Sequence, residues 1–403
     1  MRPPSPIAYL VPALVSALTL APPVPAQNGL DCAAEGADCT LREAALQAGL
    51  HVGAAEGPLG TDAAFNAALA RHFDSITTEN ALKWGPLTSG PGAYDFARAD
   101  EAVAFAEANG MRVRGHTLFW SRLNGLPGWL EHDLAAAADP AERLRERMSE
   151  HVNTVVGRYR GRIDTWDVVN EPLSLGSASL DLGNLYFQTL GVDYIADAFH
   201  LARAADPDAL LFLNEVLPSL SQPTFDGLLA LVTDLLDQGV PIDGVGFQAH
   251  YFLALPDRAV LQERLRAFAG LGLIVELTEL DVSLGILGAE PDPLAAQADA
   301  YADVFAACLA VDACVGITVW GVDDGHTWLD SFIPPGPHRP LLLDESYQPK
   351  PAYRAARDVV ALPEPGAAAR ALGVLLGLKA VAGVRSSRRR VRRGCRRHRS
   401  DGC

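Results

Sequence analysis

Short runs of apolar residues alternate along the chain with longer stretches in which apolar residues recur every three or four positions. The short runs are rich in β-branched residues and have the length of buried strands, whereas the longer stretches have the periodicity of amphipathic helices. Eight strands are predicted, at residues 51–55, 75–78, 111–118, 163–169, 210–214, 244–248, 273–280 and 316–320. Helices are predicted between and after them, at residues 62–71, 96–109, 141–159, 185–205, 224–238, 258–269, 293–310 and 353–360.

Eight strands that are each followed by a helix predict a single α/β domain with the (β/α)8 TIM-barrel fold. An open, doubly wound sheet would carry a glycine-rich fingerprint after its first strand, and residues 52–55 do not form one. The length of 403 residues could hold two average domains, but a barrel of this kind is one unit. We therefore expect one catalytic domain over residues 45–362.

The two ends of the chain differ from the barrel pattern. Residues 1–26 resemble a secretory signal peptide, with Arg2, an apolar run at 7–20 and a small-residue cleavage site at 24–26. A short lead-in follows at residues 27–44. The six cysteines form close pairs, which an oxidising compartment would allow as local disulfides: Cys32/Cys39, Cys308/Cys314 and Cys395/Cys403. Export to the cell surface or the medium is predicted.

Charge is distributed unevenly along the chain. The net charge is −16, although residues 385–403 contain nine arginines and a single acidic residue. The body that precedes this segment is therefore strongly acidic, repels nucleic acid and suits a neutral or weakly cationic partner.

Two carboxylates stand at the predicted ends of separate strands. The segment 166–172 reads Trp-Asp-Val-Val-Asn-Glu-Pro and leaves Asn170 and Glu171 at the end of the fourth strand. The segment 274–280 likewise leaves Glu279 at the end of the seventh. An isolated Asn-Glu-Pro also occurs at helix caps and turns, but two glutamates on two strand ends are what glycosidic-bond hydrolysis requires.

Other polar and aromatic residues also follow predicted strands, in segments 78–84, 114–120, 246–250 and 320–328. The carboxyl ends of the strands are where a (β/α)8 barrel carries its active site. Each residue alone has an explanation in packing or solvation, but their collection at one end of the barrel favours a binding cleft.

With these residues assembled, residues 45–360 resemble glycoside hydrolase family 10, the retaining endo-β-1,4-xylanases. The specific motifs are segments 166–172 and 276–281, and segments 79–84, 115–117, 248–250, 320–321 and 347–353 support them. The resemblance implies that Glu171 is the general acid/base, Glu279 the nucleophile, and Asp281 a support for His250. Residues that would grip the attacked sugar are Asn170, His116, Gln248 and His250. Residues that would wall the cleft are Glu79, Asn80, Lys83, Trp120, Trp320 and Trp328.

The resemblance further implies a disulfide between Cys308 and Cys314, a xylan or related β-1,4-glycan as substrate, and a monomeric enzyme that needs no metal or other cofactor. Retention follows from a double displacement, in which the charge of Glu279 favours the protonated form of Glu171. Two departures from the family pattern affect substrate preference. Ser121, Arg122 and Leu123 replace a usual histidine and glutamine after Trp120, and segment 214–216 reads Asn-Glu-Val instead of Asn-Asp-Tyr.

Other readings of these residues remain open at this point. A metal-dependent barrel hydrolase could use His116, His250, Glu279 and Asp281 as ligands, and insensitivity to EDTA would argue against it. A non-catalytic carbohydrate-binding barrel is a second alternative, which turnover of a xyloside would exclude. Within the family, exo-action or a preference for glucan is also compatible with the motifs.

The C-terminal segment 363–403 lies beyond the hydrolase resemblance. It contains Pro-Glu-Pro at 363–365, a mostly apolar run at 367–384 and the arginine cluster at 385–399. This order resembles the PEP-CTERM sorting signal of exported bacterial proteins, in which the arginines favour retention on the cytoplasmic side of the membrane. A transient contact with the membrane or sorting machinery is implied. A disordered basic tail, or a polybasic patch for anionic surfaces, is the alternative.

Overall fold

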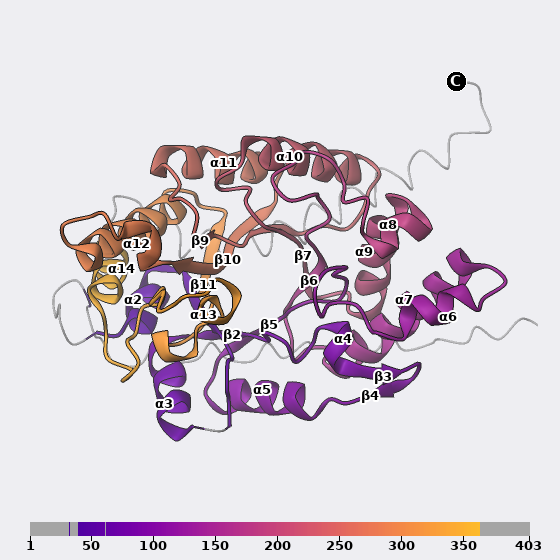
Figure 1. Ribbon diagram of the computed structural model, residues 1–403, viewed down its shortest axis with the longest axis horizontal. Coiled ribbons are helices and arrows are strands. Elements are labelled where there is room, and N and C mark those ends of the chain that lie inside the picture. Colours follow the sequence, from indigo (N-terminus) through magenta and orange to yellow (C-terminus); the bar gives the residue numbers. More distant parts are fainter. Residues whose placement is uncertain (1–31, 33–38, 61, 363–403) are drawn as a thin grey trace, which may run out of the picture.

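The computed structural model describes Cys32, residues 39–60 and residues 62–362 (Figure 1). The predicted signal peptide, most of the lead-in and the C-terminal segment with Cys395 and Cys403 lie outside the described residues. No helix in the described part of the chain is both long and apolar enough to cross a bilayer.

Eight parallel strands form a closed barrel at the centre of the molecule (Figure 1). Their order around the barrel is their order in the chain, and the last strand pairs with both the first and its own predecessor, which closes the ring. The strands are β1 (His51–Ala55), β2 (Ser75–Thr77), β5 (Arg112–Gly115), β6 (Thr165–Asn170), β7 (Leu210–Glu215), β8 (Gly244–Phe247), β10 (Ile274–Val282) and β11 (Cys314–Val319). The predicted (β/α)8 barrel is confirmed.

A ring of helices surrounds the barrel, one after each strand (Figure 1). They are α3 (Ala63–His72), α5 (Ala97–Ala108), α7 (Pro140–Arg158), α9 (Asp193–Ala205), α10 (Gln222–Asp237), α11 (Arg258–Gly270), α12 (Pro293–Leu309) and α14 (Pro351–Ala361). Two of them begin with the pair Asp-Pro. Asp139 and Asp292 accept hydrogen bonds from the first turns of α7 and α12, and the proline that follows each has a φ suited to a helix start.

The shorter elements gather on one side of the barrel, because nearly all of them lie between a strand and the helix that follows it. They are α4 (Trp84–Leu87), the antiparallel pair β3 (Thr88–Gly90) and β4 (Ala93–Tyr94), α6 (Leu130–Ala135), α8 (Leu185–Leu190), β9 (His250–Tyr251), η2 (Leu284–Leu287), η3 (Asp324–His326) and α13 (Leu329–Phe332). The exception is α2 (Leu41–Ala48), which precedes β1 and packs on α14, where the Leu41 N–H donates to the Tyr353 hydroxyl over 2.7 Å. The barrel therefore builds up its carboxyl face, the end at which active sites form.

Two predicted elements differ from the structure. The helix predicted over 185–205 is two helices, α8 and α9, because Gly191 adopts φ 66° and ψ −161°, a conformation essentially restricted to glycine. The strand predicted over 111–118 ends at Gly115 in β5. Beyond it the chain still bonds to the neighbouring strand, since Leu118 N–H donates to the Asp167 carbonyl over 3.0 Å.

The two predicted cysteine pairs that lie among the described residues both form disulfides. Cys308 in α12 is bonded to Cys314 at the start of β11, and Cys32 is bonded to Cys39.

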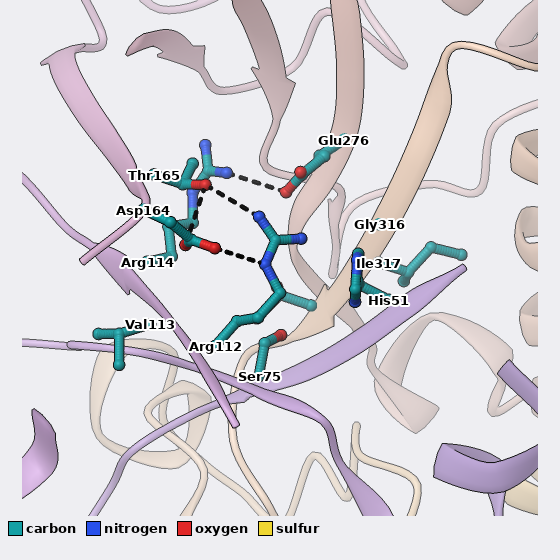
Figure 2. A pocket seen from close by; sticks show the side chains of 11 residues that line it. His51, Ser75, Arg112, Val113, Arg114, Asp164, Thr165, Glu276, Gly316 and Ile317 are labelled. Carbon is teal, nitrogen blue, oxygen red and sulfur yellow. Dashed lines mark hydrogen bonds and ion pairs between the residues drawn. The ribbon is translucent and has the colours of Figure 1, made fainter. Parts of the chain in front are cut away.

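A polar cluster fills the amino end of the barrel interior, around a cavity of about 20 Å³ (Figure 2). Arg114 is buried there between Asp167 and Glu276, and its guanidinium donates to Glu276 over 2.9 Å and to Asp167 over 3.0 Å. Arg112 lines the same cavity and pairs with Asp164 over 2.7 Å, but both of these side chains are partly exposed. The cavity has the volume of about one water molecule and polar walls to hold it.

The two arginines of this cluster should differ sharply in their effect on stability. Replacing Arg114 with methionine removes the buried guanidinium that pairs with both Asp167 and Glu276, so we expect the free energy of unfolding to fall by about 3–5 kcal/mol. Arg112→Met is the matched control, since it breaks a partly exposed pair and should cost less than about 1 kcal/mol. Urea-induced unfolding at neutral pH measures both values, and equal losses would contradict the argument.

Candidate active site

The two predicted glutamates lie at the carboxyl face, on strands that other strands separate. Glu171 directly follows β6 with a left-handed φ of 52°, and its N–H donates to the Asn214 carbonyl of β7 over 2.9 Å. Glu279 lies in the second half of β10, and its N–H donates to the Gln248 carbonyl over 2.9 Å. A left-handed conformation in a residue other than glycine stores local strain, which is frequent at functional sites.

A chain of side-chain amides connects the two carboxylates. Asn214 Nδ2 donates to Glu279 Oε1 over 2.7 Å and to Asn170 Oδ1 over 2.9 Å. Gln248 Nε2 donates to Asn170 Oδ1 over 3.3 Å and to Glu171 Oε1 over 2.9 Å. Each amide fixes the orientation of the next, so both carboxylates belong to one hydrogen-bonded network.

Asn214 was not among the predicted site residues, although it bridges the network. Thr278 Oγ1 donates to Asn214 Oδ1 over 2.7 Å, which fixes its amide with the nitrogen toward Glu279. The neighbouring strand leaves room for this side chain at Gly246, where a Cβ would lie 2.2 Å from Asn214 Oδ1. The signal that could have found Asn214 is its position at the end of β7, level with Asn170 on β6.

His250 lies between Asp281 and Glu279 and stabilises the ionised form of Glu279. Its Nε2 lies 3.2 Å from Glu279 Oε2, and its Nδ1 lies 2.8 Å from Asp281 Oδ2. Burial opposes the charged imidazolium, but Asp281 and Glu279 together raise the pKa of His250 to about 10. Burial also opposes the ionised form of Glu279, yet the hydrogen bond from His250 and the charge of His116 hold its pKa below the ordinary value. Glu279 is therefore a carboxylate at neutral pH.

One wall of the site is formed by the segment after β2. Lys83 is buried, donates to Asn80 Oδ1 over 3.1 Å and lies 4.8 Å from the centre of the Trp120 ring. Burial lowers the pKa of Lys83, and the acidic side chains around it, Glu279 first among them, oppose that shift. Asn80 in turn donates to Glu79 Oε1 over 3.2 Å.

Glu56 is a second residue that the sequence reasoning missed. It follows β1, is buried, and accepts a hydrogen bond from the backbone N–H of Glu79. Burial, and after it the charge of Glu79, raise the pKa of Glu56 to about 8. At neutral pH it is mostly a neutral carboxylic acid, bonded to the backbone of the segment after β2.

Two tryptophans contact the two histidines of the site. Trp320 lies edge-on to His116, with 5.3 Å between ring centres, and His116 Nδ1 is 2.9 Å from Asp167 Oδ2. Trp328 lies 4.8 Å from the His250 ring, and its Nε1 donates to Asp281 Oδ2 over 2.9 Å. The structure thus brings the predicted histidines and tryptophans to the same face as the glutamates.

The altered loop after Trp120 contributes a cation that no sequence argument assigned. Arg122 Nη1 lies 3.1 Å from Glu171 Oε2. Ser121 Oγ accepts from the Leu185 N–H over 2.8 Å, and Leu123, with φ 48°, is largely exposed. Within the described ranges, no group of three or more histidine, cysteine or acidic side chains has the arrangement of a metal site.

Comparisons with known proteins identify the family and agree with the barrel fold. The family model of glycosyl hydrolase family 10 matches residues 40–359. A beta-1,4-xylanase of Dictyoglomus thermophilum is 38% identical over 296 residues, which cover 71% of this chain and 81% of that protein. The crystal structure of native xylanase 10B from Thermotoga maritima superposes with a TM-score of 0.74 at 34% identity, covering 80% of this chain and 98% of that one. Xylanase 10B from Thermotoga petrophila, solved in complex with xylobiose, has a TM-score of 0.73 at 33% identity and covers 80% and 97%.

Proposed function

Because the chain belongs to glycosyl hydrolase family 10, we propose that it is an endo-1,4-β-xylanase that cleaves internal bonds of xylan with retention of configuration. The observation that carries this proposal is the network at the carboxyl face, in which an ionised Glu279 and Glu171 are joined through Asn214, Asn170 and Gln248. Two carboxylates facing one bound sugar are the machinery of glycoside hydrolysis. The solved relative with bound xylobiose supports a xylan-derived substrate.

In the first step, Glu279 attacks the anomeric carbon and Glu171 gives its proton to the glycosidic oxygen, whose bond to that carbon breaks. The leaving chain departs as an alcohol, and the sugar stays on Glu279 as an ester. In the second step, Glu171 takes a proton from water, the water oxygen attacks the anomeric carbon, and Glu279 is released as a carboxylate. Two inversions at the same carbon give net retention.

The remaining residues of the face serve binding in this proposal. Asn170 donates to the sugar 2-hydroxyl, a contact that strengthens in the transition state, and His116, Gln248 and His250 hold the same sugar. The aromatic side chains pack on the apolar faces of sugar rings. The residues that wall the cleft on the non-reducing side are Glu79, Asn80, Lys83, Trp120, Trp320 and Trp328.

Retention is testable by following the first product. Xylo-oligosaccharide hydrolysis monitored by proton NMR should release the β-anomer first, with the α-anomer appearing later by mutarotation. Reducing-end release from xylan should exceed that from other β-glucans, and EDTA should leave both rates unchanged. An α-anomer as the initial product would refute the double displacement.

We also propose that the enzyme is exported. The leader-like residues 1–26 and the Cys308–Cys314 disulfide support export. In the same proposal, the segment 363–403 is a sorting signal that is removed. Mass spectrometry of the exported enzyme should then find a C-terminus near residues 363–366, and an intact Cys403 would contradict removal.

A further inference from the structure

Three hydrogen bonds to Asp181 and the Leu173 carbonyl hold the Arg122 guanidinium in place. Its Nε and Nη2 both donate to Asp181 Oδ2, over 3.2 and 3.0 Å, and Nη2 also donates to the Leu173 carbonyl over 2.6 Å. The remaining nitrogen, Nη1, lies 3.1 Å from Glu171 Oε2. A planar guanidinium held in this way presents its last donors in a fixed direction, so its contact with Glu171 is preorganised.

The other oxygen of Glu171 is held by neutral groups. Gln248 Nε2 donates to Oε1 over 2.9 Å, and Asn170 Nδ2 approaches the same oxygen at 3.4 Å. Within the described part of the chain, the hydrogen bonds to the Glu171 side chain all come from N–H donors. Donors of this kind favour the ionised form of a carboxyl group over the protonated one.

Charged groups face Glu171 from three other elements. Lys83, after β2, is close enough to interact with it electrostatically, and Glu279 faces it from β10 through the amide network. Glu215, at the end of β7, is buried and accepts from the Leu173 and Val216 N–H groups. Burial, and then the charge of Glu171, raise the pKa of Glu215 well above its ordinary value. Among the described residues, Arg122 is the cation in hydrogen-bond contact with Glu171.

We propose that Arg122 is a positioning residue that holds the acid/base carboxyl group and shifts its ionisation in favour of the carboxylate. This inference rests on the proposed role of Glu171. Because cleavage of an unactivated glycoside needs a protonated Glu171, the guanidinium moves the upper pH limit of that cleavage downward. The same contact favours the ionised state in which Glu171 accepts a proton from water during the second step.

The test compares pH profiles of kcat/KM for the whole enzyme on two substrates. Xylotetraose has a poor leaving group and needs the proton of Glu171, whereas dinitrophenyl β-xylobioside does not. On xylotetraose, kcat/KM falls above a certain pH, the basic limb of the profile. We expect Arg122→Gln to move this limb upward by about one pH unit, since an opposite charge at this range shifts the pKa of a carboxyl group by at least that amount. Well above the limb, the variant should therefore be about tenfold faster than the parent.

Three further variants isolate the effect of the Arg122 charge. Arg122→Lys keeps the cation and should retain most of the parental limb position. The double variant Arg122→Gln/Asp181→Asn also removes the uncompensated charge of Asp181 and should still show an upward shift. Arg145→Gln removes an exposed arginine of α7, paired with Asp197, and should leave the profile unchanged. Thermal unfolding of each variant checks that the fold persists.

The two substrates distinguish the role of Arg122 from the role of Glu171 as proton donor. Suppose that the parent shows a basic limb only with xylotetraose. If Arg122→Gln or the double variant leaves that limb at the same pH, the role of Arg122 alone is refuted. An equal basic limb on both substrates in the parent would instead remove Glu171 from the role of proton donor, and the inference would fall with it.

Discussion

Replacing Glu279 with alanine is expected to lower kcat/KM on xylan by about 10⁵-fold, the order of loss seen when a covalent nucleophile is removed. The cavity left by the side chain admits a small anion on the face of the sugar from which Glu279 attacks. Added azide should therefore restore turnover of dinitrophenyl β-xylobioside and give the α-glycosyl azide, because only one inversion then occurs. Product NMR distinguishes the two anomers of the azide.

A matched control for this prediction lies on the same strand. Glu276 also belongs to β10, but its carboxylate pairs with Arg114 at the amino end of the barrel. Glu276→Gln should retain activity within a few-fold of the parent, even if the protein is less stable. If Glu279→Ala kept substantial activity without azide, or gave the β-azide, Glu279 would not be the nucleophile.

The barrel itself was predictable because its physical signals are local. A buried parallel strand is a short apolar run and a covering helix has a regular apolar stripe, so eight strand–helix repeats indicate the fold directly. The end of β6 was equally predictable, since Pro172 cannot donate a hydrogen bond to a neighbouring strand and therefore leaves Glu171 just beyond the strand. Once the fold is known, all residues that follow strands share one face.

The contacts across the barrel could not be predicted in the same way. Asn214 reaches Glu279 only because Gly246, on the intervening strand, lacks a side chain, a relation between three strands that no local pattern contains. Arg122 could be recognised as a departure from the family pattern, but its partner depends on how the loops after β5 and β6 pack together. The break at Gly191 depends likewise on one backbone conformation within an otherwise helical pattern.

Replacing Glu171 with alanine should separate two substrates that Glu279→Ala does not. Cleavage of xylan loses proton donation to its leaving group, and we expect kcat/KM to fall by about 10³-fold, within the range typical of general acid catalysis. Dinitrophenyl β-xylobioside leaves without protonation, so its kcat/KM, which reports the first step, should fall by less than about tenfold. Steady-state kinetics on the two substrates measure this ratio.

The second step gives an independent check on Glu171→Ala. Without a base to activate water, the glycosyl ester on Glu279 should accumulate, so kcat and KM on the dinitrophenyl substrate should fall together after a burst of the phenolate. Azide needs no deprotonation, so it should accelerate this step and give the β-glycosyl azide, the opposite anomer to that from Glu279→Ala. An equal loss on both substrates, with no burst, would reject Glu171 as the acid/base. The two variants together therefore assign one face of the sugar to each carboxylate.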